Sequence, residues 1–212
     1  TTMMSMFWGA LVFNQDVSNW NTSAVTDMEA MFYNTTKFNQ NLSRWNTSKV
    51  KTMRSLFNRA LAFDGDISSW DTSAVTSMSL MFWGASVFNP NDLSKWDTSK
   101  VTDMSYMFTY ASAFDGDVSS WNTSAVTNMF RMFQGASKFN QDLSAWKTSP
   151  VTDMRDMFYG ATSFNQNLCT WRDNFPYSKA CNIFANSGCK FKGTPSSVAK
   201  GPFCASDCTN NR

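Results

Sequence analysis

The sequence predicts an α/β fold, a right-handed solenoid of about seven 25-residue coils with a disulfide-rich cap at its C-terminal end. Three observations support this prediction: a 25-residue repeat, a helix-like and a strand-like segment within each repeat, and the placement of all five cysteines after residue 168. One such repeat cannot bury its own apolar side, so successive repeats must stack. We expect the repeat solenoid to occupy residues 1–171 and the cysteine-rich cap residues 172–212.

Aromatic residues and methionines recur at fixed places in the repeat. The rows are Trp20, Trp45, Trp70, Trp96, Trp121, Trp146 and Trp171; Phe13, Phe38, Phe63, Phe88, Phe114, Phe139 and Phe164; Phe7, Phe32, Phe57, Phe82, Phe108, Phe133 and Phe158; and Met3, Met28, Met53, Met78, Met104, Met129 and Met154. We interpret the stacked rows as a shared core, in which unbranched methionine fills gaps between rings. A carbohydrate-stacking ladder remains an alternative for the tryptophans, and a soft-metal site or a partner groove for the methionines.

Residues 25–35 have the spacing of a short helix, with apolar residues such as Met28 and Phe32 on one side and Ser23 or Thr26 as a possible N-cap. The segment 142–146 and its equivalents carry one inward apolar residue between turn-forming residues, which predicts a short strand. We expect these strands to pair in parallel, about 4.8 Å apart, on one face of the solenoid. The helices would then form the other face.

Stacking would also align polar residues. These rows are Asn14, Asn39, Asp64, Asn89, Asp115, Asn140 and Asn165; Ser18, Ser43, Ser68, Ser94, Ser119 and Ser144; and Thr22, Thr47, Thr72, Thr98, Thr123 and Thr148. One interpretation is mutual hydrogen bonding that satisfies backbone groups at the coil corners. The other is a regular polar surface that matches an ordered ligand such as ice or a glycan.

Composition argues against an enzyme, because the chain has no histidine and therefore lacks the commonest general base, metal ligand and proton shuttle. The Asp-Gly-Asp segments 64–66 and 115–117 lie two coils apart, and we interpret them as solvated turns rather than calcium sites. We expect no catalytic residues, no cofactor and no metal. A net charge of +2 gives no electrostatic reason for a nucleic-acid partner, and no run of 18 apolar residues could form a transmembrane segment.

The cysteines predict disulfides that stabilise the cap in an oxidising compartment. They are Cys169, Cys181, Cys189, Cys204 and Cys208. Because five is an odd number, one thiol is either free or paired with another chain, and the connectivity stays open. A zinc knuckle is the alternative, although the spacing lacks a second close pair.

Asn-x-Ser/Thr sequences predict N-linked glycans if the chain passes through a eukaryotic secretory route. They begin at Asn21, Asn34, Asn41, Asn46 and Asn122. The sequence also opens within a repeat, so we expect either that the natural chain continues upstream or that this open end docks on a partner. An uncapped edge of this kind favours head-to-tail self-assembly.

The repeat Trp-Asn/Asp-Thr-Ser-x-Val-Thr-Asp-Met-x-x-Met-Phe-x-x-Ala-x-x-Phe-Asn-Gln-Asp-Leu resembles the BspA-like surface repeat family over residues 1–171. This resemblance implies leucine-rich-repeat-like modules of the kind found in mycoplasma surface lipoproteins and secreted algal proteins. It also implies a secreted or cell-surface location and a role in adhesion and protein binding, and it supplies no catalytic residues. The cysteine-rich tail departs from the bacterial versions and, with the glycosylation sequences, favours a secreted eukaryotic protein.

We therefore expect a non-enzymatic extracellular protein that binds other proteins, extracellular matrix or glycans. The candidate binding surface consists of variable aromatic positions, for which extra packing is the alternative interpretation. They are Trp8, Tyr33, Trp83, Tyr106, Phe130 and Tyr159. Two other functions stay open: a self-assembling filament or surface-layer subunit, and an ice- or glycan-binding solenoid that uses the polar rows.

Overall fold

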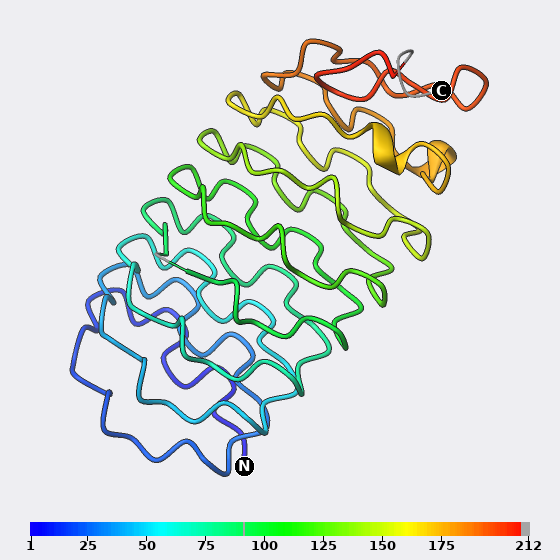
Figure 1. Ribbon diagram of the computed structural model, residues 1–212. Helices are drawn as coiled ribbons and strands as arrows, with labels where there is room; N and C mark the ends of the chain where they lie inside the picture. Colours follow the sequence, from blue (N-terminus) through cyan, green and yellow to red (C-terminus); the bar gives the residue numbers. More distant parts are fainter. Residues whose placement is uncertain (91, 209–212) are drawn as a thin grey trace.

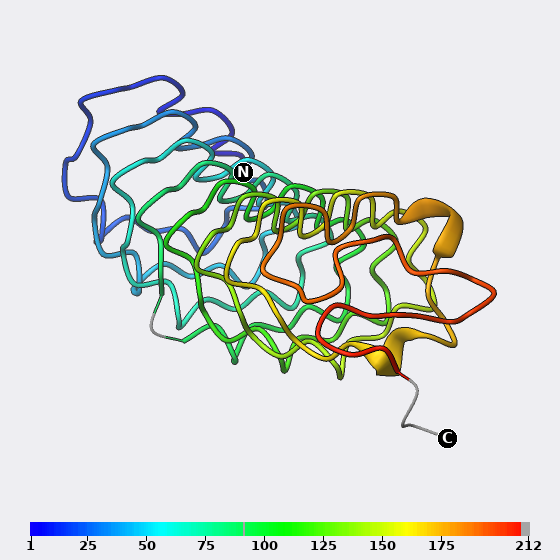
Figure 2. The same cartoon turned by 90° about the horizontal axis from the view of Figure 1, so that it is seen from above.

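In the computed structural model, which describes residues 1–90 and 92–208, the repeats form a stack of coils (Figure 1). A column of parallel β-bridges joins each coil to the next, beginning with Thr2 to Asp27 and Asp27 to Thr52 and ending with Asn128 to Asp153. Seen from above, the coils lie one behind another, with the first coils (blue) and the last described residues (red) at opposite ends of the stack (Figure 2). The structure therefore supports a repeat fold, as the 25-residue period predicts.

Within residues 25–35, Asp27 lies in a β-bridge and residues 29–34 form consecutive turns, so the prediction of a helix there is wrong. The Phe32 N–H donates to the Leu56 carbonyl of the next coil at 2.9 Å, and every second N–H of the segment is used in the same way. The Met31 N–H instead donates to the Met28 carbonyl within its own turn, at 3.3 Å. An α-helix would have used these donors four residues back in the same coil.

Left-handed residues divide the segment into turns. Two residues per coil, four positions apart, have a positive φ, for example Ala30 at 53° and Asn34 at 54°, or Arg131 at 55° and Gly135 at 66°. This conformation ends a right-handed helix and costs an ordinary L-residue roughly 1 kcal/mol. A series of four-residue turns shares the three- and four-residue spacing of a helix, and this shared spacing explains the wrong prediction.

The segment 142–146 is a turn, so the prediction of a strand there is also wrong. The Ser144 N–H donates to the Asp142 carboxylate at 2.8 Å, and the Trp146 N–H donates to the Leu143 carbonyl at 3.0 Å. A side-chain acceptor thus takes the place of a neighbouring strand. In residues 1–90 and 92–208, β-structure consists of isolated bridges, and the helices are two short 3₁₀ turns, η1 (Cys169–Trp171) and η2 (Tyr177–Lys179).

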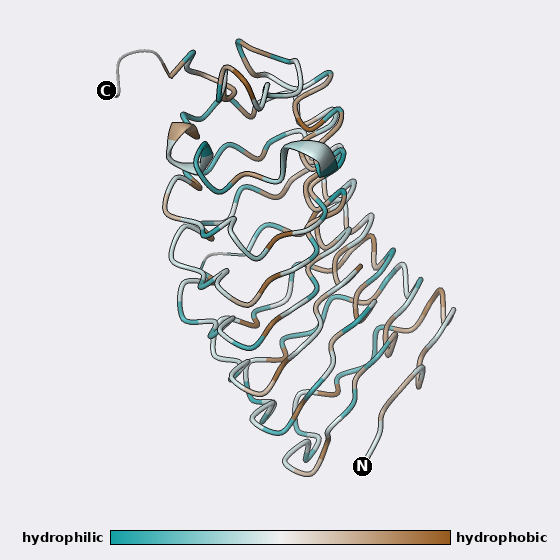
Figure 3. Cartoon of the chain, turned by 90° about the vertical axis from the view of Figure 1, so that its right-hand side faces the viewer, coloured by the Kyte–Doolittle hydropathy of each residue, from teal (hydrophilic) through white to brown (hydrophobic). Residues whose placement is uncertain are grey.

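The tryptophan, phenylalanine and methionine rows form one continuous core. Trp45 and Trp70 stack with their ring centroids 6.3 Å apart and their planes 3° from parallel. The Trp70 indole N–H donates to the Leu42 carbonyl of the preceding coil at 3.0 Å, which satisfies a buried backbone acceptor. The methionine row is fully buried from Met28 to Met154. Figure 3 shows the corresponding apolar stretches recurring at matching places in successive coils.

Two disulfides lie at the C-terminal end of the stack. They join Cys169 to Cys208 and Cys189 to Cys204, whereas Cys181 is an exposed free thiol. The expectation of disulfides in this region is therefore confirmed, and the connectivity left open by the sequence is now assigned. Cys181 is corrected from a candidate disulfide partner to the unpaired member of the set.

The last described residues return across the final coil. Cys204 forms antiparallel bridges with Asn167 and Phe191. Phe203 is fully buried and meets Phe175 edge-on, with ring centroids 4.9 Å apart. Backbone and apolar side chains at this end of the stack are therefore covered by the chain itself.

Candidate interaction face

The turn segment of each coil presents an outer face. Its buried methionines and phenylalanines alternate with residues of varied type, many of whose side chains reach the surface, and the stacking aligns these residues in columns. Aromatic and arginine side chains gather in these columns, and we call this set the aromatic–arginine face. Its members are Trp8, Tyr33, Arg59, Trp83, Tyr106, Tyr110, Phe130, Arg131, Arg155 and Tyr159.

In the N-terminal half of this face, the side chains hold one another in place. Trp8 is 55% exposed and stacks on Tyr33 with ring centroids 4.0 Å apart. The Arg59 guanidinium lies 4.7 Å from the centre of the Trp83 ring, and Tyr110 meets Trp83 edge-on at 6.0 Å. Ring and cation–π contacts of this kind order large side chains, so less conformational entropy is lost when they meet a partner.

In the C-terminal half, Phe130 lies beside two guanidinium groups, 4.8 Å from that of Arg131 and 5.0 Å from that of Arg155. Tyr106 meets Phe130 edge-on at 5.0 Å. Partial burial lowers the pKa of Arg131, but the hydrogen bond and charge of Asp156, together with Tyr106, outweigh this effect and raise the pKa. The guanidinium is therefore held as a cation beside the rings.

Carboxylates compensate both of these arginines. Arg131 Nε donates to Asp156 Oδ2 at 3.0 Å, and Arg155 Nε donates to Asp153 Oδ1 at 2.9 Å. Desolvation raises the pKa of Asp153, but hydrogen bonds and the charge of Arg155 outweigh it, so the pKa is lowered. The positive charges are thus fixed in position and largely neutralised, which suits a contact surface better than a site for a single anion.

The six residues expected to form a binding surface all lie in these outer columns, and the structure sorts them into groups. It pairs Trp8 with Tyr33 and Tyr106 with Phe130. Trp83 lies with side chains that the sequence analysis missed, and Tyr159 lines a separate hollow. The missed residues are Arg59, Tyr110, Arg131 and Arg155. Part of their signal was available, because Arg131 occupies the repeat position of Tyr106 and Arg155 occupies that of Phe130. Arg59 and Tyr110 instead occupy the position of Gly84, where the sequence analysis expected no binding residue.

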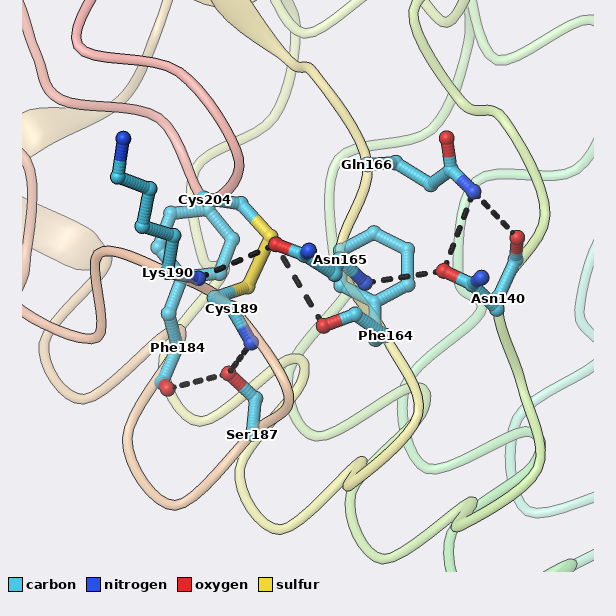
Figure 4. Close-up of a disulfide and its surroundings, with 9 residues drawn as sticks. All are labelled: Asn140, Phe164, Asn165, Gln166, Phe184, Ser187, Cys189, Lys190 and Cys204. Atoms are coloured by element: carbon cyan, nitrogen blue, oxygen red, sulfur yellow. Dashed lines mark hydrogen bonds between the residues drawn. A yellow bond between two sulfur atoms is a disulfide. The ribbon is translucent and has the colours of Figure 1, made fainter.

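The asparagine row is a chain of hydrogen bonds between coils (Figure 4). Asn140 Oδ1 accepts the Asn165 N–H at 2.9 Å, and Asn165 Oδ1 in turn accepts the Lys190 N–H at 3.1 Å. Gln166 Nε2 donates to the Asn140 carbonyl at 2.6 Å. The same backbone bond recurs in each earlier coil from Asn14 onward. The row therefore satisfies backbone donors at the surface, as its structural interpretation requires.

The threonine row is buried rather than displayed. Thr72 is 1% exposed and donates its hydroxyl to the Asp97 carbonyl of the next coil at 3.0 Å. Thr98 donates in the same way to the Asn122 carbonyl. These hydroxyls are committed to the junction between coils, so this row offers no surface for ice or a glycan.

The predicted glycosylation residues have different surroundings. Asn21, Asn46 and Asn122 occupy one position of the repeat, are exposed, and accept the N–H of the serine two residues later. Asn41 is exposed and forms a similar turn, whereas Asn34 is half-buried with a φ of 54°. The first three side chains therefore project from a single edge of the stack.

In residues 1–90 and 92–208, no group of three cysteine or acidic side chains comes together as a set of metal ligands. Asp64 and Asp115 instead accept the N–H groups of Asn89 and Asn140. The helices found in this part of the chain are too short and too polar to cross a membrane.

The chain matches a known repeat family along most of its length. No curated protein and no solved structure matches it. The family model described as "Mycoplasma protein of unknown function, DUF285" matches residues 1–91 and, in a second overlapping match, residues 81–193. Together these matches extend over the stacked coils. The chain therefore belongs to the DUF285 family of repeat proteins.

Proposed function

We propose that this chain is a non-enzymatic, extracellular repeat protein that binds other proteins through the aromatic–arginine face, as an adhesin or a component of an extracellular matrix. On this proposal, the stack is a right-handed, leucine-rich-repeat-like solenoid of the BspA-like kind. The solenoid holds the face rigid, and the outer residues determine what is bound. The family match supports a repeat protein and leaves the ligand open.

The observation that carries this proposal is the segregation of residue types around each coil. Tryptophan, tyrosine and arginine gather on one face, whereas the other outer columns carry mainly serine, threonine, asparagine and aspartate. Tryptophan, tyrosine and arginine are the residues most enriched at the energetic centres of protein interfaces. Their mutual contacts also order the face before a partner arrives.

Two disulfides support the extracellular part of the proposal, because such bonds persist in oxidising compartments and are rare in the cytosol. In a eukaryotic secretory route, the exposed Asn21, Asn46 and Asn122 would carry glycans along one edge. That edge is formed by a different part of each coil from the aromatic–arginine face. The glycans would therefore leave the proposed binding surface accessible.

The other two functions receive less support from the geometry. Head-to-tail polymerisation needs an open C-terminal end, but residues around Phe203 cover that end. Recognition of ice or glycans by the threonine row needs displayed hydroxyls, but the Thr72 and Thr98 hydroxyls are buried between coils. We therefore favour adhesion through the face.

The experiment is an adhesion assay with beads that carry the chain, on surfaces coated with a mixture of extracellular matrix proteins. We expect the Trp83→Ala/Tyr110→Ala variant to lower bead retention by roughly tenfold or more, as for loss of interface anchors. The control, Asn19→Ala/Ser120→Ala, changes exposed residues outside the face and should retain wild-type adhesion. Equal retention of all three proteins would contradict the proposal.

A further inference from the structure

The Arg59 guanidinium differs from those of the other arginines in residues 1–90 and 92–208. Within these ranges, the Arg59 side chain makes no hydrogen bond and no ion pair. The other arginines each have a carboxylate or amide oxygen beside them. They are Arg44 with Asn19, Arg54 with Glu29, Arg131 with Asp156, Arg155 with Asp153 and Arg172 with Asp173. The N–H groups of the Arg59 side chain are therefore left for a ligand or for water.

Trp83 holds the Arg59 guanidinium in place. The guanidinium lies over the Trp83 ring, 4.7 Å from its centre, and Tyr110 meets the same ring edge-on at 6.0 Å. A guanidinium that rests on a ring through one face keeps the N–H groups at its edge accessible, and Arg59 is exposed. A carboxylate accepts two such N–H groups in parallel, so the pair is both strong and fixed in orientation.

The turn segments of the first five coils contain no acidic residue, and their charged residues are Lys37 and Arg59. These segments are 5–12, 30–37, 55–62, 80–87 and 106–113. Glu29, which directly precedes the second segment, is paired with an arginine of the next coil. Asp27 and Asp103, slightly earlier in their coils, each accept the N–H of the residue two positions later. This part of the aromatic–arginine face therefore favours a partner of negative charge.

Apolar side chains are exposed in the same segments. Tyr110 is 50% exposed, and Leu61 and Val87 are exposed to a similar extent. At the centre of protein interfaces, aromatic residues and arginine are enriched and other charged residues are depleted. An ordered arginine among exposed rings is thus typical of an interface anchor.

We propose that this part of the face binds an acidic segment of another protein, in which a glutamate or aspartate adjoins an aromatic or aliphatic residue. The carboxylate accepts hydrogen bonds from the Arg59 guanidinium, and the apolar neighbour packs against Trp83 and Tyr110. An anionic membrane fits less well, because charge-driven attachment uses clusters of roughly four to eight cations and these segments carry only Lys37 and Arg59. The inference rests on the proposed function, since it names the kind of partner for the same face.

The test begins with a random dodecapeptide library displayed on phage and selected on the 212-residue chain. We expect the selected peptides to be enriched in aspartate and glutamate and depleted in lysine and arginine. Selection on the Arg59→Gln variant should lose this enrichment. Arg44→Gln is the matched control, because it makes the same substitution at an exposed arginine outside the face and removes the same charge. It should select acidic peptides like wild type.

A double-mutant cycle separates direct contact from an indirect effect on Trp83. The best acidic peptide is labelled and titrated by fluorescence anisotropy, beside a version in which its acidic residue is replaced by the corresponding amide. The amide version should bind wild type roughly tenfold more weakly, but should bind Arg59→Gln within about twofold of the acidic peptide. If Arg59 acted only by ordering the Trp83 ring, its replacement would weaken both peptides equally.

Circular dichroism checks that the variants are folded. If Arg59→Gln does not fold, Arg59→Lys replaces it in the cycle. Lysine keeps the charge but cannot hold a carboxylate through two parallel N–H groups, so the effect of the peptide's acidic residue should shrink without vanishing.

The inference is overturned if no acidic peptide is selected, or if the acidic enrichment survives the loss of Arg59. Arg59-dependent binding to phosphatidylserine vesicles, with no peptide selected, would assign the surface to a membrane instead. The bead assay tells the two proposals apart. Adhesion that needs Trp83 and Tyr110 but is unchanged in Arg59→Gln would uphold the proposed function and overturn this inference. Selection of acidic peptides without bead adhesion would support this inference and contradict adhesion to matrix proteins.

Discussion

Gly135 lies directly against the ring of Tyr110, so that a Cβ built on Gly135 would come 2.5 Å from Cδ1 of the tyrosine. Gly84 occupies the same position of its own coil and has nearly the same backbone, with φ of 68° against 66° at Gly135. A Cβ on Gly84 would meet only Arg59 Cγ, at an ordinary 3.6 Å. The two glycines therefore share one conformation but differ in the space around them.

This difference predicts unequal costs for the same substitution. Gly84→Ala should lower the free energy of unfolding by about 1 kcal/mol, the cost of the left-handed conformation. Gly135→Ala should cost about 1–2 kcal/mol more, because the Tyr110 ring must move. Urea denaturation followed by tryptophan fluorescence measures both values. In a Tyr110→Ala background the extra cost of Gly135→Ala should disappear, and its persistence would contradict this account.

The asparagine row predicts that only the side-chain acceptor matters. Asn140→Ala removes the acceptor of the Asn165 N–H and should destabilise the chain by about 1 kcal/mol. Asn140→Asp keeps an acceptor, as Asp115 does one coil earlier, and should unfold within about 0.5 kcal/mol of wild type. Thermal and urea unfolding test the pair. Equal destabilisation by both substitutions would show that the row does not act through this bond.

The aspartates of the turns predict acid sensitivity. Hydrogen bonds from Ser73 and Ser99 lower the pKa of Asp71 and Asp97 below the ordinary value. Because the folded-state pKa is lower, these carboxylates stabilise the fold fully above the ordinary pKa, and this contribution is lost as the pH falls through the folded-state pKa. Unfolding free energy should therefore decline at acidic pH below roughly 4.

A double variant isolates this effect. Asp71→Asn/Asp97→Asn keeps the turn acceptors, as Asn46 does for Ser48, but removes the titration. We expect its stability to depend less on pH in the acid range and to stay near wild type at neutral pH. Acid titration followed by circular dichroism measures the change. An unaltered acid transition in the double variant would rule out a contribution from these two groups.

The disulfides predict that the segment after residue 189, which covers the C-terminal end of the stack, can be destabilised while the coils stay folded. Cys189→Ser/Cys204→Ser opens a link between residues 15 positions apart and should cost about 3 kcal/mol in the covering segment. Limited proteolysis should then cleave after residue 189 before it cleaves the coils. Cys181→Ser replaces the exposed free thiol and serves as the control, with an expected change within about 0.5 kcal/mol. If both variants resist the protease equally, the disulfide does not hold the cover in place.

The core could be predicted from the sequence because its signal is the repeat period itself. Trp45 and Trp70 stack as the rows require, and this result needs no knowledge of local conformation. Local structure could not be predicted in the same way. The spacing of Met28 and Phe32 fits both a helix and successive turns, and the choice depends on donating N–H groups to the next coil. A clue existed in Gly9, Gly84, Gly135 and Gly160, which mark a left-handed position once per coil.

The composition of the aromatic–arginine face could be predicted only in its aromatic part. Large rings at variable positions are visible in the sequence, and Trp83 and Phe130 are examples. The arginines were missed because an arginine belongs to the face only if its guanidinium contacts an aromatic ring, and such contacts cannot be read from the sequence. Arg59 meets Trp83 across coils, 24 residues later in the chain, and only the stacked geometry shows this contact. The hollow beside Tyr159 was missed for the same reason, since three coils supply its lining.

The first left-handed position of each coil separates the requirements of the backbone from the choice of side chain. Ala30, Leu80, Tyr106, Arg131 and Asp156 hold the same backbone angle although their side chains have nothing in common. The free-energy cost of that position lies in the left-handed backbone conformation. Replacing one side chain by another should therefore change the stability of the fold little. Duplicating or deleting a whole coil would likewise lengthen or shorten the stack while the contacts within the remaining coils stay the same. The side chains at these positions can therefore change while the architecture remains the same.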